Sequence, residues 1–411
     1  MHPRPRETKL AIKKNGILNE VFRSGSCQRF DLAQRLNINA TMMGNYVEEL
    51  IAAGLLVEGD PAASSRGRAP LHVNPQHGCF LGLDFEALRG RAVLCDFAGE
   101  VLEQKEISFR SDISRVGVLN RIIKLAKELA GLADRPLLSI GIAAPGQVDC
   151  ESGRVLHYRL LSDFDQVPLR DRFEEAFETP LFLEDNIRAL AYGELLRGSG
   201  KGCRNFLCLA VRSGVGLGIV IDGKLYSGSN SMAGEVGYLV FNTTQGPQLA
   251  TDLVSTKGFV DSTLKLINTQ KVTTGRKELL EKEEDVTLAD IISVAEAGDD
   301  VLLEQLKQLG NHLGMLAANL ANLFAPEKII LAGEVPDCSL VVRQQMERTF
   351  RRYTLPQILT TVYLEDGSLG GFAGALGAAW MGFAKTFPVD EETLIQQAKE
   401  KQQTKHFTAK V

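Results

Sequence analysis

The stretch from Val211 to Tyr238 (VRSGVGLGIVIDGKLYSGSNSMAGEVGY) is the strongest constraint on the fold. It begins with glycines in alternation, and Asp222-Gly223 then predicts a two-residue hairpin turn, because both residues tolerate positive φ angles. A second loop of small residues carries Glu235 as its one strong acceptor. The glycines are explained either by tight turns and strand packing or by close approach of a ligand to the backbone. In the second interpretation, Glu235 accepts hydrogen bonds from a polyol.

Length and composition indicate a multidomain globular protein. The chain has 411 residues, more than one domain usually contains, and 44% of them are hydrophobic. The net charge is -5, yet residues 1–75 carry more basic than acidic residues, which suits a DNA contact there. The seven cysteines form no C-x-x-C pair, which fits a reduced, cytoplasmic setting. We expect neither a signal peptide nor a membrane span.

Residues 1–75 have the pattern of a helix-turn-helix domain. Apolar spacing predicts helices over residues 9–23, 30–36 and 40–53, followed by a hairpin wing. In such domains the second helix of the pair enters the major groove with its N-terminal residues on base edges. The candidates for DNA contact are Asn39, which also suits the helix N-cap, Thr41, Met42 and Asn45, with Tyr46 as a further one. A helical bundle that binds protein is the alternative.

A loop or linker is predicted over residues 61–75 (PAASSRGRAPLHVNP), which are rich in serine, glycine and proline. Arg66 and Arg68 place two guanidinium groups on this extended segment. The negative potential of a narrow minor groove attracts arginine. The segment is therefore either an arm that enters the minor groove or a solvated basic linker.

Beyond residue 75 the chain alternates strands and helices, which indicates an α/β body. Pro145 and Gly146 lie in the loop GIAAPGQVD, which follows a buried strand and is also explained by plain turn chemistry. Asp185 and Asn186 begin a helix over residues 187–196. There they serve either as its cap or as hydrogen-bonding contacts to a ligand.

These motifs together resemble those of the ROK family of repressors and sugar kinases. The similarity rests on the stretch 211–238, the loop 141–149, the segment PEKIILAGEV at 326–335 and the connection RGRAP…NP. It implies a winged helix-turn-helix over residues 1–75 and a ribonuclease-H-like α/β body of two lobes, residues 76–200 and 201–385, with a polar tail over residues 386–411. It also implies a sugar cleft. The residues expected to contact the sugar are Pro145, Gly146, Asp185, Asn186, Glu235 and Tyr238.

Departures from the kinases of the family oppose phosphoryl transfer. The place of their glycine-rich phosphate loop is taken by residues 84–88 (DFEAL), in which Glu86 would repel phosphate. Asn186 stands where the resemblance puts the catalytic Asp, although a one-residue slip would restore Asp185 as the base.

Two further departures lie in the second lobe. Tyr238 replaces the histidine of the family, and residues 239–260 contain no Cys or His for the zinc cluster that most members carry. We therefore expect no catalytic residue, no metal and no cofactor.

The sequence thus predicts a DNA-binding transcriptional regulator, a repressor of carbohydrate metabolism. Its partners would be a double-stranded DNA operator and a sugar or sugar-derivative effector, bound by a homodimer or higher homo-oligomer in the cytoplasm. The alternatives are an ATP-dependent sugar kinase that has a DNA-binding head, and a regulator whose body only dimerises or binds a protein partner.

Overall fold

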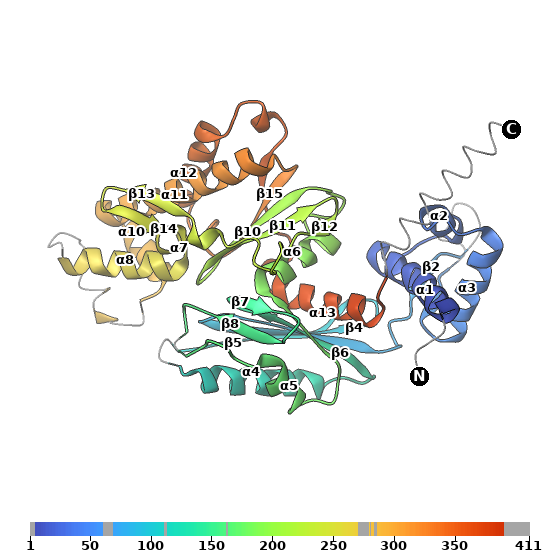
Figure 1. Ribbon diagram of the computed structural model, residues 1–411. Helices are drawn as coiled ribbons and strands as arrows, with labels where there is room; N and C mark the ends of the chain where they lie inside the picture. Colours follow the sequence, from blue (N-terminus) through green and yellow to red (C-terminus); the bar gives the residue numbers. More distant parts are fainter. Residues whose placement is uncertain are drawn as a thin grey trace.

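The computed structural model describes residues 5–60, 69–110, 113–161, 163–269, 279, 281–282 and 286–389. In this part of the chain two α/β lobes lie one above the other, and a small helical head lies beside them (Figure 1). None of the described helices combines the length and apolarity needed to cross a membrane. Most of the predicted polar tail lies outside the described residues, and so does most of the charged stretch at residues 275–285 (GRKELLEKEED).

The head consists of three helices and a two-stranded antiparallel sheet. Its elements are α1 (Pro5–Ser24), α2 (Arg29–Arg35), α3 (Ala40–Ala52), β1 (Leu56–Glu58) and β2 (Leu71–Val73). The three predicted helices are confirmed. The linker predicted over residues 61–75 is wrong at its end, because β2 pairs with β1. Leu71 and Val73 are buried and alternate with half-buried His72, a two-residue period that nearby prolines obscured.

A five-stranded sheet with the order β5-β4-β3-β6-β9 forms the first lobe. Its strands are β3 (Cys79–Phe85), β4 (Arg89–Asp96), β5 (Val101–Ser108), β6 (Leu137–Ala144) and β9 (Leu181–Asp185). The first three run antiparallel, whereas β6 and β9 run parallel to β3 and β6 respectively. The remaining elements are α4 (Arg115–Ala130), the hairpin β7 (Gln147–Asp149) and β8 (Arg154–His157), and α5 (Leu169–Glu174). The parallel strands β6 and β9 lead into a pocket: Pro145 directly follows β6 and Asp185 ends β9, and both residues line it.

The second lobe repeats this plan with the order β12-β11-β10-β15-β16. Its strands are β10 (Phe206–Val211), β11 (Val215–Ile221), β12 (Lys224–Leu225), β15 (Lys328–Gly333) and β16 (Tyr363–Asp366). Its helices are α7 (Ala250–Val254), α8 (Thr256–Thr269), α10 (Leu288–Glu296), α11 (Asp300–Phe324) and α12 (Leu340–Tyr353). A separate hairpin joins β13 (Val240–Thr243) to β14 (Gly246–Leu249). The apolar helix predicted over residues 301–324 is confirmed as α11.

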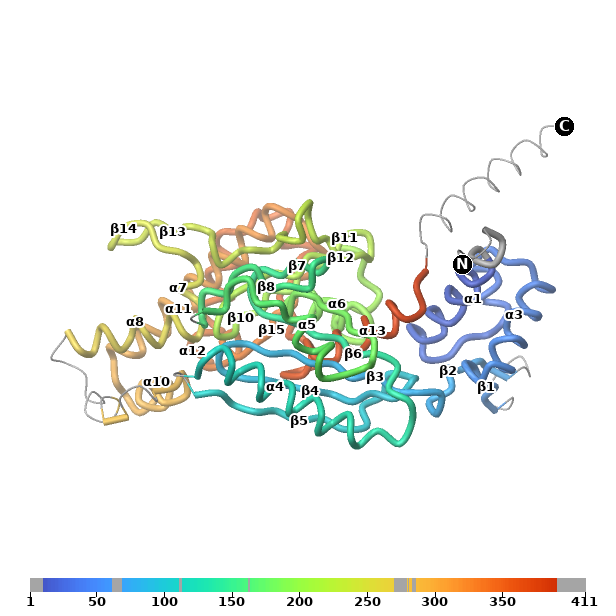
Figure 2. Tube along the Cα trace, turned by 60° about the horizontal axis from the view of Figure 1, so that its bottom comes forward, coloured from blue at the N-terminus to red at the C-terminus, as the bar shows by residue number. Residues whose placement is uncertain are grey.

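Two helices lie where the lobes meet, α6 (Asn186–Arg197) and α13 (Ala373–Thr386). They approach each other so closely that a Cβ added at Gly377 would lie 1.8 Å from the carbonyl oxygen of Ala189. α13 lies equally close to the first-lobe sheet, since a Cβ at Gly141 would be 2.0 Å from the carbonyl oxygen of Ala378. The end of α13 leads toward the head (Figure 2). Only glycine permits both contacts, so they fix how the body packs.

Candidate functional site

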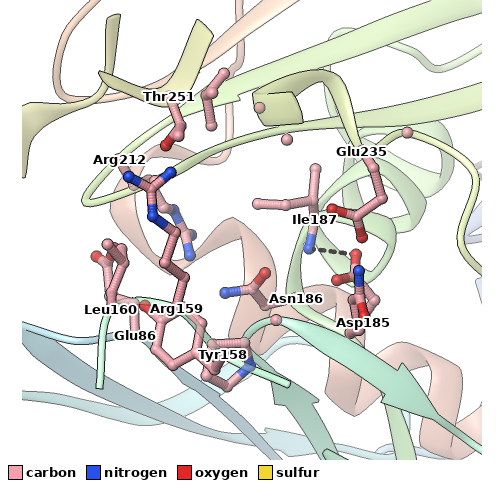
Figure 3. A pocket seen from close by; sticks show the side chains of 18 of the residues that line it. Glu86, Tyr158, Arg159, Leu160, Asp185, Asn186, Ile187, Arg212, Glu235 and Thr251 are labelled. Carbon is pink, nitrogen blue, oxygen red and sulfur yellow. Dashed lines mark hydrogen bonds between the residues drawn. The ribbon is translucent and has the colours of Figure 1, made fainter. Parts of the chain in front are cut away.

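A cleft between the lobes brings together segments that are far apart in the sequence. The six residues expected to contact a sugar all line this one pocket: Pro145, Gly146, Asp185, Asn186, Glu235 and Tyr238. They come from the loop after β6, from the start of α6, and from the short 3-10 helix Val236–Tyr238 with the loop before it. Figure 3 shows Asp185 and Glu235 on one side of the pocket, with Glu86 and Arg212 on the other.

Asp185 is the N-cap of α6. Its Oδ1 accepts hydrogen bonds from the backbone N–H groups of Ile187 (3.0 Å) and Arg188 (2.9 Å). Burial raises the pKa of Asp185 to about 6, and the negative charge of Glu184 adds to the rise. One carboxylate oxygen is thus held by the helix, and the other is available to the pocket.

Asn186 is buried, and its side-chain amide is hydrogen-bonded within the protein. Its amide donates a hydrogen bond of 3.3 Å to the carbonyl oxygen of Phe85, at the end of β3. The side chain therefore ties α6 to the first lobe while it lines the pocket (Figure 3). An amide in this place accepts no proton from a substrate hydroxyl.

Glu235 stands across from Asp185 on the second lobe. The preceding Gly234 has φ +98°, and a Cβ there would lie 1.9 Å from the carbonyl oxygen of Leu217, so only glycine permits this loop. Desolvation by the cleft walls raises the pKa of Glu235, and the charge of Asp185 raises it further. Two carboxylates thus converge on one space, an arrangement that suits the hydroxyl donors of a polyol.

The glycine stretch packs against α6 and also borders the pocket. Gly216 and Gly218 pack against α6, because added Cβ atoms would lie 2.8 Å from Ile187 Cγ1 and 2.3 Å from Ala191 Cβ. Gly214 has no such close neighbour and lines the pocket. The predicted turn is confirmed: Asp222 and Gly223 both have positive φ angles, 52° and 74°, between β11 and β12.

The turn at residues 84–88 forms a polar bridge to the second lobe. Glu86 Oε2 accepts hydrogen bonds from the Ser213 backbone N–H (3.2 Å) and from Ser213 Oγ (2.6 Å). Beside it, Arg212 donates to both oxygens of Asp84, at 3.2 and 2.8 Å. All four residues are buried. Burial alone would lower the pKa of Arg212, but the Asp84 and Glu86 carboxylates outweigh it and hold that pKa above its usual range.

Sequence reasoning missed several pocket residues that contact distant parts of the chain. Tyr158 follows β8, and its hydroxyl accepts a hydrogen bond of 3.0 Å from the Ala87 backbone N–H. Arg159 reaches across the cleft to Asp252 of α7 at 2.6 Å. Arg188 donates to the Ser231 carbonyl oxygen at 2.5 Å, which connects α6 to the loop before Glu235. No local pattern in the sequence distinguishes these side chains from the other tyrosines and arginines of the chain.

The segment at residues 239–260, where most members of the resembled family carry a zinc cluster, forms the β13–β14 hairpin, α7 and the start of α8. Within the described ranges, no three His, Cys, Asp or Glu side chains are grouped as metal ligands would be. Tyr238 ends the short 3-10 helix before β13, and its side chain is exposed at the pocket.

In the head, the predicted DNA contacts lie at the N-terminal end of α3. Asn39, Thr41 and Asn45 are exposed and Met42 is half-buried. Asn39 is the N-cap, as predicted, and its Oδ1 accepts a hydrogen bond of 2.8 Å from the Met42 backbone N–H. Tyr46 is wrong as a candidate, because its side chain is buried in the core of the head. Arg66 and Arg68, between β1 and β2, lie outside the described residues.

Comparisons with known proteins agree on one family. A model of the ROK family matches residues 80–385. The glucokinase of Halalkalibacterium halodurans is 29% identical over 311 residues, which cover 74% of this chain and 94% of the relative. The xylose repressor of Bacillus spizizenii is 26% identical over 370 residues, 89% of this chain and 93% of the relative. A solved ROK transcriptional regulator, a homologue of the E. coli MLC protein, superposes with a TM-score of 0.74 and 25% identity over 94% of this chain and 99% of its own.

We predict that Asp185→Asn stabilises the protein at pH 7.5 by about 1–2 kcal/mol. The raised pKa means that the folded state binds the Asp185 proton more tightly than the unfolded state does. The free energy of unfolding of the wild type therefore falls as the pH rises toward 6. Above that pH the full cost of the buried charge is present. Asparagine caps a helix about as well as aspartate but carries no charge. Thermal melts from pH 4.5 to 7.5 should show the gain of the variant shrinking toward low pH.

Asp149→Asn is the matched control. Hydrogen bonds from the Ser152 side chain and backbone lower the pKa of Asp149, so this variant should lose stability at pH 7.5. If Asp185→Asn raised the stability by the same amount at every pH, the buried charge of the Asp185 carboxylate would not be the cause.

Proposed function

The chain belongs to the ROK family, and we propose that it is a DNA-binding transcriptional regulator that represses genes of carbohydrate metabolism and senses a sugar or sugar derivative. The observation that carries the proposal is a head of three helices and a two-stranded wing, joined to a body whose cleft holds two converging carboxylates. The alignment with the xylose repressor extends over more of this chain than the alignment with the glucokinase, 89% against 74%. A regulator of this kind acts on double-stranded DNA in the cytoplasm.

The head is proposed to bind DNA as a winged helix-turn-helix, with α3 in the major groove. Thr41 and Asn45 are four residues apart and so share one face of α3. Asn45 is the better candidate for bidentate pairing with adenine, because the Asn39 oxygen is already occupied by its cap. Met42 would contact a thymine methyl group. Arg66 and Arg68, in the segment between the wing strands, are proposed to enter the minor groove.

The body is proposed to bind the effector between Asp185 and Glu235. Asn186, Pro145, Gly146 and Tyr238 complete the wall, and Tyr238 offers a ring on which a sugar face can stack. Assembly as a homodimer would place two heads on two operator half-sites, so an effector that favours one arrangement of lobes or subunits changes the fit to DNA.

A sugar kinase is the second candidate, because a carboxylate with a pKa of about 6, such as Asp185, suits a general base near neutral pH. Glu86 argues against it. Its buried carboxylate takes the place of the phosphate loop and is already bonded to Ser213, so a nucleotide phosphate would meet a negative charge there. The regulator is therefore preferred.

Asn45→Ala is expected to weaken binding to a duplex selected by the wild type from a random library about tenfold, the loss of one good base contact. Fluorescence anisotropy at fixed salt measures this change. Asn242→Ala, an exposed asparagine on β13 of the body, is the control and should bind normally. Equal affinities of all three proteins would remove Asn45 from the interface.

Glu235→Ala is expected to lower sugar affinity about 10- to 100-fold, because a charge-assisted hydrogen bond is lost. Calorimetry with D-xylose, D-glucose and N-acetyl-D-glucosamine measures it after a thermal-shift screen of the wild type. Glu103→Ala, on the exposed edge strand β5, is the control. If none of the sugars shifts the wild-type melting temperature and Glu235→Ala alters no response, the sensing model fails.

No ATP-dependent phosphorylation is expected when the wild type is incubated with the same three sugars, because Glu86 repels phosphate and Asn186 accepts no proton. A coupled assay for ADP release provides the measurement. Sugar-dependent turnover that disappears in Asp185→Ala would establish the kinase in place of the non-enzymatic regulator.

A further inference from the structure

One helix, α6, joins the proposed sugar cleft to the DNA-binding head. Asp185 and Asn186 stand at its N-terminus and line the cleft. Arg197 is its last residue and contacts the head. Twelve helical residues span about 18 Å, so the two ends lie well apart but belong to one rigid element.

Arg197 holds two separate segments at once. Its Nη2 donates to the carbonyl oxygen of Phe22 on α1 at 3.3 Å and to that of Ala98 in the turn between β4 and β5. The guanidinium carbon lies 4.9 Å from the ring centroid of Phe22 and 5.2 Å from that of Trp380 on α13. Its Nη1 also pairs with exposed Glu100 at 2.8 Å. A planar fork that donates to carbonyls and stacks on rings is a geometry that lysine does not reproduce.

The head is also joined to the end of α13. The rings of Phe22 and Phe383 stack with centroids 3.8 Å apart. Asn19 Nδ2 donates to the Phe387 carbonyl oxygen at 2.8 Å. Because α13 and α6 touch through backbone at Gly377, the head, α13 and α6 form one continuous packed unit.

The other side of α6 packs on the second lobe. Ala191 lies against Gly218 of β11, and Ile187 lies against Gly216, with no side chain between the strand and the helix. Glu194, fully buried in α6, accepts a hydrogen bond of 3.1 Å from the Leu369 backbone N–H just before α13. Any shift of the second lobe relative to the first therefore acts directly on α6.

We propose that α6 transmits occupancy of the cleft to the DNA-binding head, and that Arg197 is the positioning residue that makes this coupling. The inference rests on the proposed function, since it presupposes that the protein binds both a sugar and DNA. A ligand bound by both Asp185 and Glu235 contacts both lobes, and it thereby fixes the position of the helix between them. Because Arg197 bonds to Phe22 of α1, a change in the position of α6 moves α1 and changes the orientation of α3 toward DNA. Such coupling is reciprocal, so DNA must change sugar affinity by the same factor.

The test compares wild type with Arg197→Ala in the full chain. It measures the affinity for a duplex selected by the wild type from a random library, with and without saturating D-xylose, D-glucose or N-acetyl-D-glucosamine, and the affinity for each sugar without DNA. In the wild type the effective sugar should change the DNA affinity at least about fivefold. In Arg197→Ala that change should fall to within about twofold while the sugar affinity stays at the wild-type value. A merely structural role would leave the ratio of DNA affinities intact.

Three further variants sharpen the result. Arg197→Lys keeps the charge and most of the stem, so it decides the question if Arg197→Ala does not fold, and it should also lose most of the coupling. Glu100→Ala removes only the exposed ion pair and should couple as the wild type does. Arg204→Ala, an exposed arginine paired with Asp222 at the far hairpin, is the matched control.

The outcomes separate the two proposals. Full coupling in Arg197→Ala overturns the role of Arg197 but leaves the proposed function standing. If the alanine variant is unfolded, full coupling in Arg197→Lys has the same meaning. A wild type that binds no sugar of the three, or no duplex, overturns the proposed function and the relay with it. Loss of coupling together with intact sugar binding supports the relay.

Discussion

A buried polar cluster that crosses the cleft sets the relation of the two lobes, and the rest of the structure depends on it. Asp84 and Glu86 of the first lobe meet Arg212 and Ser213 of the second, and none of the four exposes more than 5% of its surface. Separating buried, paired charges leaves each without a partner at a cost of several kcal/mol. Arrangements of the lobes that break these contacts are therefore disfavoured unless water or a ligand replaces them.

This cluster divides the cleft into two unlike halves. On one side, Asp84 and Glu86 accept hydrogen bonds from the protein itself, in the turn that the family resemblance aligns with the phosphate loop of the kinases. On the other side, Asp185 and Glu235 face an open space with acceptor capacity to spare. Asp185 is built into the cap of α6, so a ligand that contacts it acts directly on that helix.

The features that could be predicted from the sequence are those with local causes. The Asp222-Gly223 turn and the Asn39 cap follow from the conformations and hydrogen bonds that these residues favour within a few positions. The six residues that the family resemblance assigns to a sugar site line one pocket, but the resemblance leaves the roles of Asp185 and Asn186 open. Only the geometry separates them, one as a helix cap and the other as a bond to Phe85.

The features that escaped prediction depend on partners far away in the sequence. Glu86 was expected to repel phosphate, but nothing in its neighbourhood indicated the bond to Ser213, 127 residues later. The contact of Arg197 with Phe22 also escaped prediction, because 175 positions of sequence separate the two residues. Tyr46 was misassigned because its helix position alone does not reveal that the fold of the head covers it.

The boundary drawn at residue 75 separates segments of the chain, but it does not separate hydrophobic cores. Phe22 of the head shares one buried cluster with Phe80 and Phe97 of the first lobe and with Phe383 of α13. A head joined only by a linker would reorient freely, and no event in the cleft would change its presentation to DNA. A head packed into the same core as α13 moves only when that core moves, so a displacement of α6 at the cleft must either be absorbed by close-packed glycine contacts or reach α1. Close packing leaves little room for the glycine contacts to absorb the displacement. A small change between Asp185 and Glu235 is therefore expected to move α3.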